Sequence, residues 1–520
     1  MILSLKYFFI LKLSRMFFVN YLKYTLLMSI IFSGLGVVNA QTKIGLFDNH
    51  IDIGEVKSSG FASYNEKNQT YTIGGSGKNM WFDNDDFHYL WTTMQGDFIL
   101  RTEVEFLGSG VDPHRKAGWI IKNDLNSETP HVNACVHGDG LTSLQYRTTI
   151  GSNTEEVVSK DSLPSVIQLE RRGNEFIMST STFGAPFVEV KTINEGINKQ
   201  VYVGLYVCSH NPDILEVAKF RNVRIIRPAP SDFQPYRDYI GSHLEVLEVS
   251  TGHRQILHST SNSIQAPNWT PDGEQLIYNS EGRLYRYNLS DGRISPLNTG
   301  FAINNNNDHV LTFDGTLMGI SHHNAEDINQ STLYYLPVKG NATPVQVTPR
   351  GAGNSYLHGW SPDNKKMLFT GHRKGQFDIY SVDILTGEEV QLTNQKTLDD
   401  GSEYSPDGIH IFFNSVRSGR MQLWRMNADG SHQIQLTHDE YNDWFPHVSP
   451  DKKWIAFISF PKDIDVNDHP FYKHCLLRIM PYNGGTPKII GYIYGGQGSI
   501  NVPSWSPDSK FISFVSNSKL

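Results

Sequence analysis

The chain has 520 residues, of which 39% are hydrophobic and 19% charged, with a formal net charge of −8 and a pI near 6.2. This length exceeds what one hydrophobic core supports, so two or three domains are expected. The acidic balance gives no support for nucleic-acid binding, which depends on a basic face.

The first 40 residues have the features of an export signal. Lys23 is followed by an apolar run from Leu26 to Val38, and small Ala40 precedes Gln41. A basic start, a short apolar core and a small residue before the cut are typical of a secretory peptide, and the run is short for a membrane span. We predict cleavage of residues 1–40, no membrane insertion afterwards, and a periplasmic or secreted protein; an uncleaved anchor is the alternative.

Residues 42–227 alternate polar and apolar side chains in short runs. Examples are the segments 98–106, 176–179 and 201–207, which turn residues separate without a sustained helical period. This pattern is typical of an antiparallel β-sandwich. Cys135 and Cys208 lie in this region and could pair, but three buried free thiols, with Cys475 the third, are favoured because a disulfide-stapled exported protein would carry more cysteines.

A stiff linker follows over residues 228–240. It begins with three prolines between Arg227 and Pro235, and such a segment resists compact folding. The second domain is expected at 241–520.

A short motif then recurs six times, 42 to 57 residues apart, and a hydrophobic strand follows each copy. This is the period of a four-stranded propeller blade. The copies begin at Trp269, Leu311, Trp360, Tyr404, Val448 and Trp505.

The first and last strands of the propeller segment should pair and close this ring. The last copy is followed by a single strand near 511–515, whereas the segments 243–249 and 254–258 precede the first copy as two spare strands. Pairing them removes the exposed sheet edges of a broken ring. We therefore predict an all-β protein in which a β-sandwich precedes a six-bladed β-propeller.

The Ser/Thr-Pro-Asp motifs form tight turns at one end of the ring. We assign their aspartates a structural role, because such carboxylates accept hydrogen bonds from nearby backbone amides. The residues concerned are Asp272, Asp363, Asp407, Asp451 and Asp508.

The opposite end carries richer connections, and the first strand of each blade brings residues to the axis there. Clustered imidazoles suit a divalent metal or a general base, and arginines suit a carboxylate or sulfate. Hydrogen-bonded channel histidines and blade-to-blade ion pairs are the structural alternatives. We predict catalytic roles for His309, His358, His447, Arg373 and Arg417, metal ligation by His322, His323, His358 and Gln497, and substrate binding by Glu403, Arg420, Trp444, Lys462 and His469.

Two parts of the chain resemble known families. The segment from Phe413 to Ser431, with Gln435-Leu-Thr437, resembles the repeat of TolB-type propellers over residues 240–520. TolB is a periplasmic binding protein with a different N-terminal domain. The first domain resembles a concanavalin-like sandwich family over 45–226, through the segments 75–81, 96–98, 114–118 and 137–147.

The propeller is also similar to oligogalacturonate lyases. In that family axial histidines and a glutamine hold a divalent metal, and the site performs β-elimination on a uronate. The resemblance implies a metal such as Mn or Ca, with Gln497 or Gln376 completing its ligands.

Three functions follow as hypotheses. The first is a lyase or dehydratase acting at the uronic-acid ends of acidic oligosaccharides during polysaccharide degradation. The second is a non-catalytic sugar- or protein-binding propeller, with a possible protein partner on the sandwich domain. The third is a glycoside hydrolase, which needs two carboxylates across the scissile bond; Glu403 with Asp399 or Asp443 could supply them.

Overall fold

The computed structural model describes residues 43–327 and 329–520, so the predicted signal peptide lies outside the described residues. Its contacts group Gly45–Leu520 into one compact unit. Every regular element described is a β-strand, apart from the three-residue 3₁₀ turn η1 (Ala325–Asp327). No helix in the described residues is long and apolar enough to cross a membrane.

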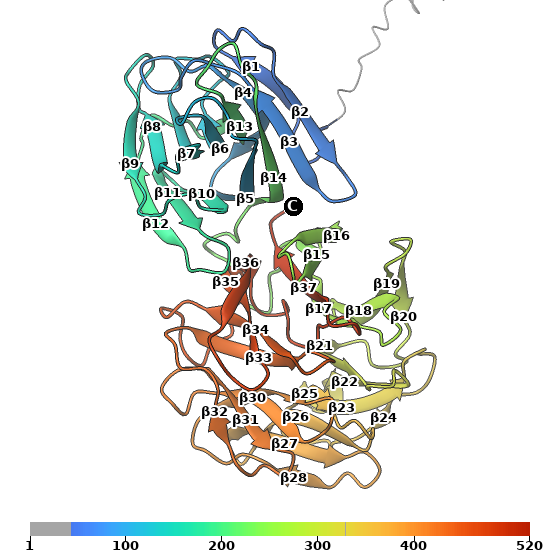
Figure 1. Cartoon of the computed structure of the whole chain (residues 1–520). Helices are drawn as coiled ribbons and strands as arrows, with labels where there is room; N and C mark the ends of the chain where they lie inside the picture. The colour runs from blue at the N-terminus through green and yellow to red at the C-terminus, as the bar shows by residue number, and fades with distance from the viewer. Residues whose placement is uncertain (1–42, 328) are drawn as a thin grey trace, which may run out of the picture. The chain divides into compact units, whose positions relative to one another are not determined.

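Residues 49–226 form two seven-stranded antiparallel sheets (Figure 1). The predicted strands are present as β5, β11 and β13. One sheet has the order β1 (Asn49–Ile53), β4 (Phe87–Gln95), β13 (Gln200–Cys208), β6 (Lys116–Lys122), β7 (His131–His137), β8 (Thr142–Arg147) and β9 (Glu155–Val158). The other has the order β12 (Val188–Ile193), β11 (Glu175–Ser181), β10 (Val166–Arg172), β5 (Phe98–Leu107), β14 (Glu216–Ile226), β3 (Thr70–Gly75) and β2 (Phe61–Asn65).

The two sheets contact each other through β3 with β4 and β13, and through β10 with β6 and β7. Alternate apolar side chains fill the layer between them, which is where burial stabilises such strands. Phe47 packs between the sheets, with its ring centroid 5.3 Å from that of Tyr71 on β3 and 6.2 Å from that of Trp119 on β6. All three cysteines are free and buried, which confirms the prediction of free thiols.

Five four-stranded antiparallel sheets follow as propeller blades. Their strands are β17 (Gln265–Trp269), β18 (Gln275–Ser280), β19 (Arg283–Asn288) and β20 (Ile294–Leu297); β21 (Asn305–Leu311), β22 (Leu317–Asn324), β23 (Gln330–Pro337) and β24 (Val345–Gln346); β25 (Ser355–Trp360), β26 (Lys366–Arg373), β27 (Gln376–Asp383) and β28 (Glu389–Gln391); β29 (Asp399–Tyr404), β30 (His410–Ser415), β31 (Gln422–Asn427) and β32 (Ile434–Gln435); β33 (Asn442–Val448), β34 (Trp454–Phe460), β35 (Lys473–Pro481) and β36 (Lys488–Gly495).

The sixth blade joins the two ends of the propeller sequence. Its strands are β15 (Ser242–Glu248), β16 (Arg254–Thr260) and β37 (Phe511–Asn517), in the order β16-β15-β37. Trp505 adds a single bridge to Ile512 on the inner side. The predicted closure of the ring is confirmed, as is the six-bladed propeller.

The recurrent motif stabilises its own turn and, in two copies, the contact with the preceding blade. In each copy the aspartate accepts a hydrogen bond from the preceding Ser or Thr hydroxyl, as Asp363 Oδ1 does from Ser361 Oγ at 2.6 Å. Two of the three motif tryptophans bond to the preceding blade: Trp360 Nε1 donates to Val310 O at 2.9 Å, and Trp505 Nε1 donates to His447 O at 2.9 Å. The structural role predicted for these turns is therefore confirmed.

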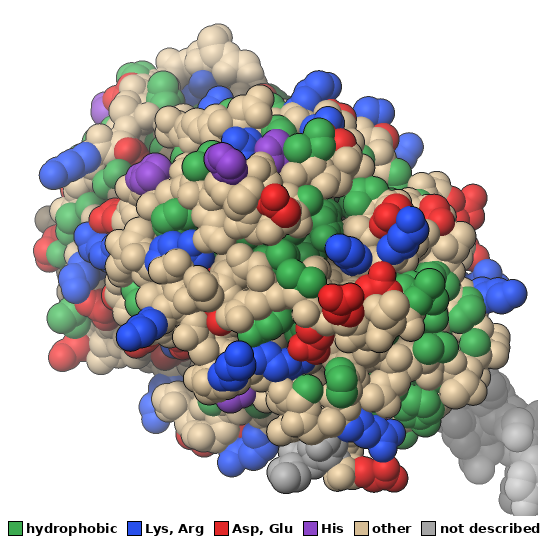
Figure 2. All heavy atoms as spheres, turned by 90° about the horizontal axis from the view of Figure 1, so that it is seen from below, with side chains coloured by type: hydrophobic (Ala, Val, Ile, Leu, Met, Phe, Trp, Pro, Cys, Tyr) green, Lys and Arg blue, Asp and Glu red, His purple; other side chains and the backbone are tan. Residues whose placement is uncertain are grey.

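The face of the molecule in Figure 2 shows Lys and Arg side chains interspersed with Asp and Glu, without an extended area of one sign. Such mixing favours solubility and gives little long-range steering of a charged partner.

Candidate functional site

The innermost strands of four successive blades place the site. Strands β21, β25, β29 and β33 contact one another in that order around the axis. Each inner strand of the five complete blades has a register shift in its pairing with the next strand, for example between Asp400 and Glu403 in β29. Such bulges turn side chains out of the regular alternation, and here they bring several polar groups together.

His358 on β25 lies at the centre of this group. Its Nε2 is 3.1 Å from Asp400 Oδ1, and Nδ1 makes no hydrogen bond to the described residues although it is buried. The imidazole also packs on Phe445, with ring centroids 5.5 Å apart. Burial alone would lower the pKa of His358, but Asp400, Asp308 and the Asn501 carbonyl outweigh it and raise the pKa above its usual value.

Asp400 is the fixed partner of this histidine. Its Oδ1 accepts hydrogen bonds from Thr370 Oγ1 at 2.6 Å and from the Gly401 amide at 2.8 Å. Burial would raise the pKa of Asp400, but His358, Thr370 and Gly401 stabilise its anion and lower the pKa. The side chain is 20% exposed against 5% for His358, so this pair retains access to solvent.

Asp308 on β21 is a second carboxyl with the opposite shift. Burial and the neighbouring Asp400 charge raise its pKa to about 6, against a smaller lowering by His358. Asn306 Nδ2 donates to Asp308 Oδ2 at 2.7 Å. Two carboxyls whose environments move their pKa values apart are the pattern of an acid–base site.

Aromatic and amide groups surround the histidine and its two carboxyls. His469 stacks on Trp444 with ring centroids 5.2 Å apart, and its ring nitrogens make no close hydrogen bond within the described chain, although the Gln497 side chain lies beside them. Burial lowers the pKa of His469 to about 4, so this ring is neutral at pH 7. We call His358, Asp400, Asp308 and His469 the axial cluster.

A pocket of 450 Å³ opens at the same end of the propeller. It lies among the turns and connections that also begin the inner strands. Its lining residues are Gly375, Gln376, Phe377, Lys396, Thr397, Leu398, Val416, Gly419, Val466 and Asn467.

Two predicted catalytic histidines hold blades together instead. His309 has backbone carbonyls at both ring nitrogens, Asn307 O and Ile277 O, each at 3.1 Å. His447 Nδ1 is 2.7 Å from Glu403 Oε2, and its Nε2 is 2.7 Å from Ile500 O. Glu403 also accepts from the Val448 amide at 3.0 Å, so this predicted substrate-binding residue links neighbouring blades.

The predicted arginines are committed to ion pairs. Arg373 forms a bidentate pair with Glu389, at 3.0 and 2.7 Å. Arg417 Nη2 is 2.6 Å from Asp399 Oδ2. Arg420 is half-buried and forms no ion pair within the described residues. Each of these two pairs lies within a single blade, so Arg373 and Arg417 are occupied by carboxylates but do not form the blade-to-blade pairs named as the alternative.

The four predicted metal ligands do not share one set of neighbours, although Gln497 and His358 both adjoin His469. His322 packs near Phe301 and Tyr334, with centroids 5.9 and 6.0 Å away. His323 Nδ1 is 2.8 Å from Asn329 O. Gln497 lies near His469 and contributes to its pKa, while His358 pairs with Asp400. Of the predicted binding residues, Trp444 is buried beside the axial cluster, where it stacks on His469, and Lys462 forms a surface pair with Glu440 at 2.9 Å.

The carboxylates suggested for a glycoside hydrolase are paired as well. Asp399 is bound to Arg417, and Asp443 Oδ1 lies 3.1 Å from Arg478 Nη1. Sequence reasoning missed Asp308 and Asp400, which are adjacent to the residues it chose, His309 and Asp399. The polar residues that begin β21 and β29 could have indicated a site there. The sequence does not show which of these side chains faces the axis, because the bulges in the two strands decide it.

Comparison with known proteins agrees with this architecture. A family model described as the TolB beta propeller domain matches residues 330–469. The uncharacterized protein Atu1656 of Agrobacterium fabrum is 42% identical over 276 residues, which are 53% of this chain and 92% of that protein. The chain belongs to the TolB β-propeller family.

Solved structures extend the comparison. A protein of Agrobacterium tumefaciens with a provisional TolB designation is 40% identical, with a TM-score of 0.51, over 54% of this chain and 100% of that one. An oligogalacturonate lyase in complex with manganese is 13% identical, with a TM-score of 0.34, over 48% of this chain and 73% of that one. A likeness this distant says nothing about the activity or the metal of this TolB-type propeller.

Proposed function

We propose that the axial cluster is a proton-transfer site and that the protein catalyses β-elimination at uronic-acid ends of oligosaccharides. The observation that supports this most is His358, a buried imidazole whose Nε2 lies on a carboxylate and whose Nδ1 makes no close hydrogen bond to the described chain, although the Asn501 carbonyl acts on the ring. A carboxylate in this position fixes the tautomer and leaves the second nitrogen available as a base.

In this mechanism His358 Nδ1 takes the C5 proton of the uronate. Asp400 stabilises the imidazolium that forms, and its three hydrogen bonds keep it ionised in that role. The bond from C4 to its oxygen substituent then breaks and a C4=C5 double bond forms. The leaving group is water in a dehydratase and a sugar in a lyase.

Asp308 supplies the acid. A carboxyl with a pKa of about 6 is partly protonated near neutral pH, so it can donate to the leaving oxygen or to the carboxylate of the substrate. Arg373 and Arg417 are occupied by ion pairs with Glu389 and Asp399 and do not face the substrate as free cations. The neutral, protonated carboxyl of Asp308 is therefore the proton donor in this mechanism. A divalent metal such as Mn or Ca would act as a Lewis acid on the carboxylate of the substrate, but the predicted ligands do not share one set of neighbours and give it no assembled site, and no step depends on it.

The two seven-stranded sheets would be a concanavalin-like sandwich domain of residues 42–227, and the segment 228–240 would link it to the propeller at 241–520. Export to the periplasm or outside the cell, with removal of residues 1–40, fits an oligosaccharide substrate. A protein partner could bind the sandwich domain.

A second candidate is a binding propeller without chemistry. The paired arginines favour it, because two carboxyls at the axis repel an anionic substrate unless positive groups compensate. A neutral saccharide or a protein segment would then occupy the axial end.

An ultraviolet assay for a C4=C5 double bond separates the two candidates. The protein is incubated with acidic oligosaccharides from pectin, alginate and sulfated algal glucuronans, with and without chelator, and products are weighed by mass spectrometry. New absorbance with loss of water indicates a dehydratase, and new absorbance with chain shortening indicates a lyase. Binding without new absorbance on the whole panel contradicts the elimination and supports the binding propeller.

A further inference from the structure

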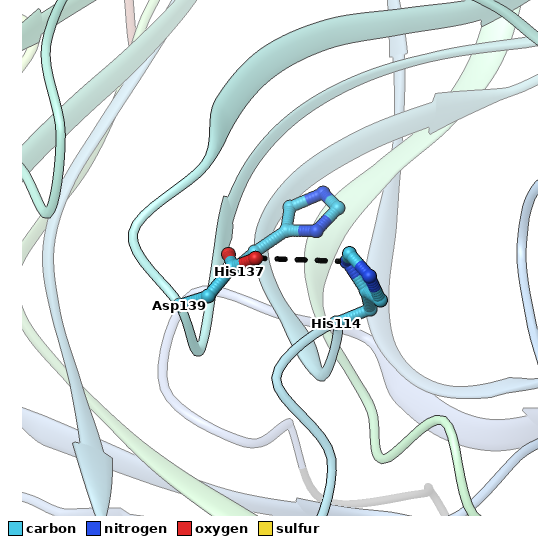
Figure 3. A group of neighbouring side chains, drawn as sticks. All are labelled: His114, His137 and Asp139. Carbon is cyan, nitrogen blue, oxygen red and sulfur yellow. Dashed lines mark ion pairs between the residues drawn. The ribbon is translucent and has the colours of Figure 1, made fainter.

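Two histidines and an aspartate meet away from the propeller, at one end of the first seven-stranded sheet (Figure 3). They are His114, just before β6, His137 at the end of β7, and Asp139 in the turn to β8. Each offers a ligand atom, and these atoms lie within 4.8 Å of one another. In the described residues this is the one group of three or more His, Cys, Asp or Glu that meets this spacing.

Backbone hydrogen bonds hold the two loops in register. The Gly138 amide donates to Arg115 O at 2.9 Å, and the Asp139 amide donates to Pro113 O at 2.8 Å. Asp112 Oδ1 accepts from the His114 amide at 2.7 Å, and Asp139 Oδ1 accepts from Leu141 N at 3.0 Å. The second oxygen, Asp139 Oδ2, faces His114 Nδ1 at 3.8 Å. Two loops fixed in this way present their ligands with little loss of entropy on binding.

The buried histidine has an unsatisfied nitrogen. His137 is only 3% exposed, and its Nδ1 makes no hydrogen bond to any described residue. Its Nε2 faces the amide of Gln145 at 3.4 Å, so the ring has a partner on one edge. A buried nitrogen without a partner is costly unless something outside the chain satisfies it.

A third histidine borders the group, and charges of both signs surround it. The ring centroid of His210 lies 5.9 Å from that of His114, and its Nε2 is also buried without a hydrogen bond in the described chain. Lys116 opposes a cation here, because its charge acts on both His137 and His210. Asp139 and Asp112 carry the compensating negative charge.

We infer that His114, His137 and Asp139 form a binding site for a divalent transition-metal ion such as Zn²⁺. Two imidazoles and one carboxylate are a donor set that such ions favour, and three protein ligands leave a position open for water or a fourth ligand. Ligand atoms around tetrahedral zinc are roughly 3.3 Å apart, so the 3.8 Å between His114 and Asp139 closes with a small side-chain movement. This inference is independent of the function proposed for the propeller.

The test is calorimetric titration of the chelator-treated full chain with ZnCl₂, with metal content measured by mass spectrometry after dialysis. One ion per chain is expected for the wild type. Asp139→Asn and His114→Ala change exposed residues, so both should fold normally and weaken binding by about 10-fold or more. His137→Ala should do the same, with its thermal midpoint measured alongside. His438→Ala, an exposed histidine elsewhere, is the matched control and should bind like the wild type.

Two further measurements make the result specific. Cobalt(II) bound at this site should give a visible absorption band that Asp139→Asn alters. Lys116→Gln should tighten binding, because it removes the opposing charge. Absence of binding, or equal binding by wild type, Asp139→Asn and His114→Ala, would overturn the site. Loss of binding in His358→Ala alone would also overturn it and place the ion at the propeller axis.

Discussion

Three histidines at similar positions of the inner strands have different surroundings. His309 and His447 have acceptors at both ring nitrogens, whereas His358 has Asp400 at one nitrogen and no hydrogen bond to the described chain at the other. A ring whose nitrogens are both engaged supports the fold, and a ring with one free nitrogen can exchange a proton. The role of each histidine therefore follows from its neighbours and not from its residue type.

The pKa of His358 is directly measurable by NMR titration of the imidazole signals. We expect a value above that of an unperturbed histidine, because Asp400 and Asp308 stabilise the charged ring. In Asp400→Asn the value should fall, since the largest favourable interaction is lost. Because catalysis requires the neutral ring, the rate should rise with pH through this pKa. The midpoint of this pH–rate profile should move to lower pH in Asp400→Asn. An unchanged titration in Asp400→Asn would contradict the pairing.

Asp308 should make stability depend on pH. Its carboxyl has a pKa of about 6 in the fold, against 3.8 as the ordinary value. Between these values the unfolded chain has released the proton and the folded chain retains it, so stability falls as pH rises from about 4 to 6. Asp308→Asn should flatten this slope and raise the free energy of unfolding at pH 7 by about 1–3 kcal/mol.

Urea unfolding at several pH values measures this difference. Asp291→Asn, an exposed aspartate in a blade turn, is the control and should leave the slope unchanged. Lower stability of Asp308→Asn at pH 7 would show that the carboxylate is better satisfied than its burial implies.

At the scale of elements, the inner strands explain both what the sequence predicted and what it missed. Residue periodicity placed the strands and the Ser/Thr-Pro-Asp turns correctly, because both depend on local preferences. The register shifts do not depend on local preferences in this way. At these shifts Ala266, Gly401 and Phe445 occupy the left-handed region, at φ values of 54°, 64° and 55°. Ala and Phe give no local signal for this conformation, so the facing of Asp308 and Asp400 could not be read from alternation.

The link between His447 and Glu403 predicts a stability effect. His447→Ala leaves a buried carboxylate and the Ile500 carbonyl without their partner, and it should cost about 2–4 kcal/mol. Differential scanning calorimetry measures it as a lower thermal midpoint. A variant with an unchanged midpoint would mean that His447 does not hold the blades together, and would return it to the catalytic candidates.

At the scale of the whole molecule, closure of the ring depends on a buried charge. Glu245 on β15 accepts a hydrogen bond from Ser516 on β37 and pairs with Arg254 at 2.7 Å and with Arg224 at 2.6 Å. These arginines lower the pKa of Glu245 despite its burial. The sequence predicted that the first and last strands of the propeller pair with each other. It did not predict this network, because its members come from separate parts of the sequence and form no local pattern.

Removing one member of such a network leaves buried charges unpaired. Glu245→Ala should therefore reduce the free energy of unfolding by about 3–5 kcal/mol. Glu248→Ala, on the same strand but partly exposed, should change it little. Equal stability of the two variants in urea unfolding would contradict a role for Glu245 in closing the ring.

The most direct test of the central claim compares two histidine variants on a substrate that the ultraviolet assay identifies. We predict that His358→Ala loses turnover by about 100-fold or more at a temperature well below its thermal midpoint, where the variant is folded. His447→Ala should retain turnover at that temperature, although its thermal midpoint is lowered. Full turnover in His358→Ala would contradict the account of the axial cluster as a proton-transfer site.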